Sequence, residues 1–106
     1  MRFLITLDYE LFFGRQVGTV EHCMLRPVRE LLKVVDRYGV KLTLFVDAGY
    51  LHQLKRQAET APELMQDHER ISEQLNHLVE LGHDVQLHIH PHWEDSVYRD
   101  GAWHIH

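Results

Sequence analysis

The sequence predicts an α/β fold built from parallel βαβ units. Three short apolar runs, at residues 2–7, 41–46 and 84–89, have the length and composition of buried strands. Helical patterns lie between these runs, and a glycine ends each helical pattern before the next strand. Strands that alternate with helices in this way form parallel sheets, in which the chain crosses back over the sheet before each new strand.

The first crossover contains one predicted helix. A loop is expected at 8–23, where Gly14 and Gly18 occur. From about Met24 to Tyr38, apolar residues recur at helical spacing. A proline in the first turn of this segment suits a helix start, and Gly39 supplies the stop.

The second crossover contains two predicted helices. Residues 48–58 form the shorter one, for which Asp47 is a suitable N-cap. The longer helix extends to Leu81, and Thr60 and Glu63 match a capping box at its start. After the third strand, the pair Asp100-Gly101 separates two short β-like runs and predicts a hairpin.

Composition limits the classes of protein to which the chain can belong. With 106 residues, 44% hydrophobic and 25% charged, it resembles a single soluble globular domain spanning 1–106. Its net charge of -5 argues against non-specific nucleic-acid binding, which requires clustered Lys and Arg. The first apolar run is too short and too charged nearby for a signal peptide or membrane span, so a cytoplasmic location is expected.

Acids and imidazoles follow the predicted strands. Asp8 and Glu10 come directly after the first run, and the third run leads into the stretch LHIHPHW with His88, His90 and His92. Because parallel strands end at one edge of a sheet, these side chains are expected to meet there. Two imidazoles, one carboxylate and an open position are a frequent catalytic zinc shell, and a second carboxylate can act as the base.

Other residues near this edge have simpler interpretations. Asp47 is expected to cap the following helix and not to bind metal. Trp93 is a candidate substrate-binding residue, although aromatic side chains more often belong to the core. The single Cys23 cannot form a disulfide within the chain.

The segments FLITLDYE, LTLFVDAGYL and ELGHDVQLHIHPHW together resemble the first three landmarks of the polysaccharide deacetylase family, which contains the NodB homology domain and is carbohydrate esterase family four. The resemblance implies an irregular (β/α) barrel, of which this chain is the N-terminal portion. It also implies a metal-dependent hydrolase that removes the acetyl group from an N-acetylated sugar of a polysaccharide or peptidoglycan, with a divalent metal, zinc by default, as cofactor.

The resemblance assigns a role to four positions of this chain. Asp8 resembles the catalytic base, and His88 and His92 have the spacing of the metal-binding pair. The metal-binding acid of the family follows the base directly; Tyr9 occupies that position here, so Glu10 is the nearest candidate. Proline follows the second histidine in the family motif but precedes it here, which leaves His90 as an alternative ligand.

Several landmarks of the family have no counterpart in the sequence. Barrels of this kind need roughly 200–250 residues, and the general-acid histidine that the family carries later in the chain is not matched. The chain alone is therefore expected to have little or no turnover. Two alternatives stay open: another barrel metallohydrolase of the amidohydrolase type, or a non-catalytic fragment. Such a fragment would bind metal or sugar, or would associate with a partner or with a second copy of itself through the edge of its unfinished sheet.

Overall fold

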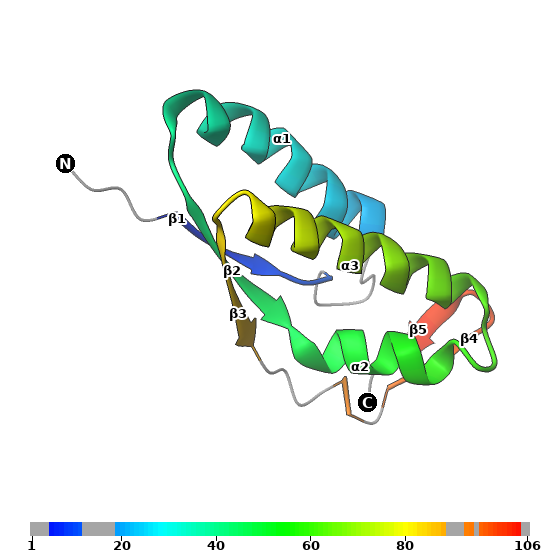
Figure 1. The fold of residues 1–106 in the computed structure, drawn as a ribbon. Helices are drawn as coiled ribbons and strands as arrows, with labels where there is room; N and C mark the ends of the chain where they lie inside the picture. Colours follow the sequence, from blue (N-terminus) through cyan, green and yellow to red (C-terminus); the bar gives the residue numbers. More distant parts are fainter. Residues whose placement is uncertain (1–4, 12–18, 89–92, 95, 105–106) are drawn as a thin grey trace.

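A three-stranded parallel sheet forms the centre of the molecule. The computed structural model describes residues 5–11, 19–88, 93–94 and 96–104. In this part of the chain, β1 (Ile5–Tyr9), β2 (Leu42–Asp47) and β3 (Asp84–His88) lie in the order β1-β2-β3, with both neighbouring pairs parallel (Figure 1). The prediction of parallel βαβ units is thus confirmed. The described strands form an open sheet and no closed barrel.

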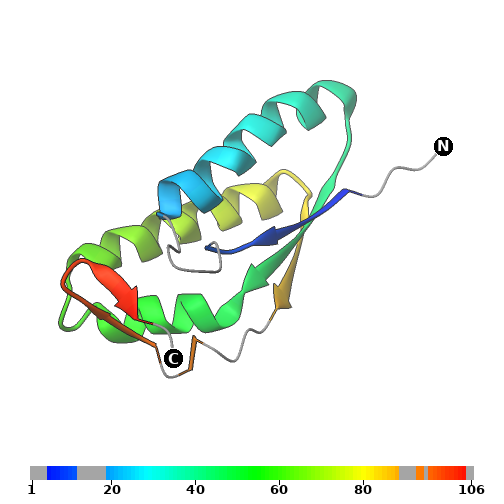
Figure 2. The same ribbon diagram turned by 180° about the vertical axis from the view of Figure 1, so that it is seen from behind.

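The helices of the two crossovers cover one face of the sheet. α1 (Arg26–Val35) and α3 (Glu63–Glu80) lie side by side on the same side of the strands in both views, while α2 (Ala48–Gln57) continues from the end of β2 (Figures 1 and 2). The side chains that alternate toward these helices form the core together with apolar residues of the helices themselves. Its most buried aliphatic members are Leu42, Leu44, Val46, Leu54, Leu64, Ile71 and Leu78.

The opposite face of the sheet is polar. Asp8, Asp84 and Gln86 are exposed on it, and Phe45 is half-buried between Asp8 and Gln86, its register partners. At the edges, β1 and β3 each pair only with β2 among the described residues, and Leu87 of β3 is 73% exposed. Parallel sheets are normally covered on both faces, so this polar face is an unusual feature of the described part of the chain.

The first helical segment begins earlier than the sequence pattern indicated. A π-helical turn at Glu21–Leu25 precedes α1 and continues into it, in place of the end of the predicted loop. Thr19 Oγ1 accepts a hydrogen bond from the His22 amide at 3.1 Å, which satisfies one of the free N–H groups at this helix start. Gly39, with φ of 67°, ends the segment as predicted, in the left-handed conformation that favours glycine.

The predicted capping box at the start of α3 is wrong. Pro62 occupies the N-cap position, and no side chain caps this helix. Thr60 instead donates from its hydroxyl to the Gln57 carbonyl at 3.2 Å, and its amide bonds to the same oxygen. The turn that closes α2 therefore uses the threonine that the sequence pattern assigned to α3.

The predicted hairpin is confirmed. β4 (Val97–Arg99) pairs antiparallel with β5 (Ala102–His104), and Asp100 and Gly101 both have positive φ, as the tight two-residue turn requires. The hairpin lies beside α2 and the turn from α2 to α3 (Figures 1 and 2). It brings Tyr98 and Trp103 into contact with the core.

Candidate functional site

The strand register aligns three polar residues at the carboxyl edge of the sheet. Asp47 and His88, the last residues of β2 and β3, are register partners. Tyr9 pairs with Val46, so the next residue, Glu10, follows β1 at the same level as Asp47. Glu10 and His88 are both half-buried. The backbone register therefore places Glu10, Asp47 and His88 at one edge of the sheet, and the meeting of the expected side chains there stays a prediction.

Asp8 lies inside β1 and not beyond its end, because the strand continues to Tyr9. Its neighbour Tyr9 is 1% exposed and faces the helices, whereas Asp8 itself is exposed. Because side chains alternate along a strand, Asp8 belongs to the polar face of the sheet. It lies two register positions inside the edge that Glu10 and His88 occupy.

Asp47 caps α2, as the sequence predicts. Its Oδ1 accepts a hydrogen bond from the Tyr50 amide at 3.2 Å, and the residue is 1% exposed. The cap fixes the point at which β2 turns into α2, directly beside His88. An aspartate in this position satisfies a free helix N–H and interacts favourably with the positive end of the helix dipole.

Replacing Asp47 by alanine should lower the free energy of unfolding by about 1 kcal/mol, the typical effect of losing an N-cap. Chemical denaturation followed by circular dichroism measures this change. Asp47→Asn keeps an acceptor oxygen and should retain most of the stability. Equal losses in the two variants would show that the negative charge matters more than the hydrogen bond.

The described residues do not by themselves complete a metal site. Among them, no three His, Cys, Asp or Glu side chains gather closely enough to hold a metal ion. His90 and His92 lie outside the described residues, so the choice between them stays a prediction. Glu10 and His88 supply a carboxylate and an imidazole, the donor types that zinc binds.

Trp93 is in the interior of the protein. It is 1% exposed, and its ring lies 4.8 Å from that of Tyr50 and 5.2 Å from that of Trp103, measured between centroids. Gln53 of α2 donates from Nε2 to the Glu94 carbonyl at 2.9 Å, which ties the residue after Trp93 to the helix. This environment is that of a packing residue; substrate binding by Trp93 stays a prediction.

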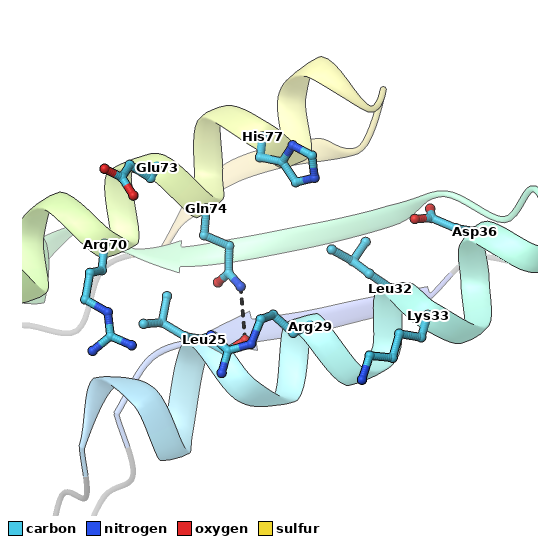
Figure 3. A pocket seen from close by; sticks show the side chains of 9 residues that line it. All are labelled: Leu25, Arg29, Leu32, Lys33, Asp36, Arg70, Glu73, Gln74 and His77. Carbon is cyan, nitrogen blue, oxygen red and sulfur yellow. Dashed lines mark hydrogen bonds between the residues drawn. The ribbon is translucent and has the colours of Figure 1, made fainter.

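The sequence analysis did not single out the groove between α1 and α3, which has a volume of about 560 Å³ (Figure 3). Gln74 crosses its floor: its Nε2 donates to the Leu25 carbonyl at 3.0 Å, and its Oε1 accepts from the Tyr9 hydroxyl at 2.5 Å. Burial raises the pKa of the Tyr9 phenol, which keeps it a neutral donor. In the sequence, Gln74 lies three residues after Ile71 and four residues before Leu78. This helical spacing could have indicated that Gln74 shares the inward face of α3.

Two arginines that line this groove belong to an ion-pair cluster. Arg29 and Arg70, which both line the groove, pair with the carboxylate of Glu21, and the Arg70–Glu21 distance is 2.6 Å. The hydrogen bond from Arg29 holds the pKa of Glu21 below its ordinary value. All three side chains are at least 40% exposed, so the cluster connects the start of the first helical segment to α3 with little effect on stability.

Comparisons with protein-family models, curated proteins and solved structures give no match for this chain. Within the described residues, no helix is both long and apolar enough to cross a membrane. The functional interpretation therefore depends on the residues themselves.

Proposed function

We propose that the chain binds a divalent cation, zinc by default, at the carboxyl edge of β1–β3, and that this site belongs to a hydrolase of the polysaccharide deacetylase type. The alignment of Glu10 with Asp47 and His88 across three strands carries the proposal. These residues are far apart in the sequence, and the parallel register brings them to one level of one edge. Sites of α/β proteins form at this end of parallel strands.

The proposed ligands are Glu10, His88 and His92, with His90 as the alternative to His92. A carboxylate and two imidazoles leave a coordination position open on zinc, as catalytic sites require. We assign Asp47 to the cap of α2 and not to the ligand set, because its Oδ1 accepts the hydrogen bond that caps this helix. A divalent cation bound in such a site supplies Lewis acidity toward a carbonyl group.

Asp8 is the proposed general base. It is exposed on the polar face of β1, two residues before Glu10, which directly follows the end of the strand. A carboxylate next to the reacting water can accept the proton released during attack on an acetyl carbonyl. The substrate class, an N-acetylated carbohydrate, follows from the resemblance of the three strand segments.

Metal analysis of the purified chain after dialysis against zinc tests the ligand set. We expect about one equivalent of zinc in the wild-type chain and at least tenfold weaker binding in His88→Ala, since even residues that only support ligands change metal affinity by this factor. His90→Ala and His92→Ala are compared to identify the second imidazole. His52→Ala, an exposed position of α2, is the control and should bind like the wild type.

The variant Asp8→Asn tests whether Asp8 acts as a base and not as a metal ligand. It should bind zinc as tightly as the wild type, because Asp8 is not a proposed ligand. Circular dichroism of every variant confirms that it is folded. A wild-type chain that binds no zinc, or three histidine variants that all retain full occupancy, would contradict the proposed site.

A further inference from the structure

His83 connects the beginnings of two neighbouring strands. It lies in the turn between α3 and β3, and its side chain is fully buried. Its Nδ1 accepts a hydrogen bond from the backbone amide of Leu42, the first residue of β2, at 2.9 Å. The register of β2 and β3 begins one residue further along, with Thr43 opposite Asp84. The imidazole therefore closes the end of the β2–β3 pairing that is opposite Asp47 and His88.

This hydrogen bond requires a neutral imidazole with its proton on Nε2. An imidazolium carries N–H groups at both nitrogens and has no acceptor to offer the Leu42 amide. Protonation of His83 would thus place two donors against each other in a buried position. An unpaired buried amide is costly, so the strand start would have to open or the ring would have to leave its place.

The charged groups around His83 oppose its protonation overall. Lys41, directly before β2, donates from Nζ to the Leu81 carbonyl at 2.7 Å and places a positive charge nearby. His77 of α3 acts in the same direction. Among the described residues, Asp36 acts in the opposite direction: its Oδ1 is 3.8 Å from Nε2, and its side chain is half exposed, where solvent screens it.

We propose that His83 is a pH-sensitive lock, which holds β2 against β3 while it is neutral and releases the start of the two strands when it is protonated. Burial, followed by the charge on Lys41, lowers the pKa of His83 below its ordinary value of 6.5. In the open state the imidazole is solvated and regains that ordinary value. The lock is therefore at full strength above about pH 6.5 and weakens as the pH falls toward the lowered pKa of the closed state.

Hydrogen exchange measured by NMR on the metal-free chain tests the lock independently of the proposed zinc site. Protection factors of the Leu42 amide and of the amides of β2 and β3 are compared at pH 7.5 and 5.5, after correction for the intrinsic exchange rates. We expect the Leu42 protection factor to fall by up to about tenfold, because an open state with the ordinary pKa gains protons over this interval. Amides of α1 should change less.

Two variants identify the group responsible. His83→Asn places an uncharged acceptor oxygen near the position of Nδ1, so the Leu42 protection factor should become independent of pH. His52→Asn, at an exposed position of α2, should retain the wild-type dependence. A Leu42 protection factor that is equal at the two pH values in the wild type, or that falls equally in His83→Asn, would overturn the lock.

A spectroscopic measurement on the wild type removes any dependence on how well the variants fold. The ring nitrogen shifts of His83 at pH 7.5 should identify a neutral imidazole with the proton on Nε2 and an acceptor at Nδ1. A proton on Nδ1 at this pH would overturn the proposal, because that tautomer cannot accept from the Leu42 amide.

Discussion

Trp93→Ala should lower the free energy of unfolding by about 3–5 kcal/mol, the usual loss when a large aromatic side chain is removed from a core. Trp93 is 1% exposed and packs against Tyr50 and Trp103, and Trp103 in turn contacts Tyr98. The indole thus connects α2 to the β4–β5 hairpin. Since small domains have a total stability of roughly 5–15 kcal/mol, the variant should be close to unfolding at room temperature.

Urea denaturation followed by far-ultraviolet circular dichroism measures the loss without relying on the fluorescence of the residue removed. Trp93→Phe keeps an aromatic ring in the cluster and should recover part of the lost stability. Tyr38→Ala, at a position 72% exposed, is the control for loss of an aromatic side chain and should cost little. Wild-type stability in Trp93→Ala would contradict the packing role of the indole.

The strands and their order were predictable because their signals are local. Each apolar run is short, and the periodicity of the intervening segments is helical. Asp100-Gly101 likewise specifies its turn through backbone conformation alone. The exact end of β1 was not predictable: Tyr9 belongs to the strand, and its hydroxyl donates to Gln74 of α3, a contact that the neighbouring residues do not reveal.

The errors occurred where two local patterns compete for the same residue. Thr60 fits a capping box by spacing, but its hydroxyl bonds to the turn that ends α2. Val20, Cys23 and Met24 already have the spacing of a buried helical face, yet nearby Gly18 suggested a loop. In the candidate site, the common edge of Glu10, Asp47 and His88 followed from topology. The hydrogen-bond partners of His83 and Gln74, by contrast, come from distant segments that sequence spacing does not identify.

Gln74→Leu should lower the free energy of unfolding by about 1–3 kcal/mol, although leucine is the more hydrophobic residue. The substitution leaves the Tyr9 hydroxyl, whose ring is 1% exposed, without its acceptor, and it removes the donor to the Leu25 carbonyl. Chemical denaturation measures the loss. Gln66→Leu, at an exposed position of the same helix, is the matched control and should change stability by less than about 0.5 kcal/mol.

A double-mutant cycle with Tyr9→Phe determines how much of this loss belongs to the hydrogen bond between the two side chains. Tyr9→Phe removes the hydroxyl, so in that background Gln74→Leu no longer leaves a buried donor unpaired. We expect the double variant to be more stable than the sum of the single losses predicts, by at least about 0.5 kcal/mol. Additive losses would contradict the contact and would mean that Gln74 acts only through Leu25. The coupling energy thus measures the contribution of one side-chain contact between β1, which carries Asp8, and α3.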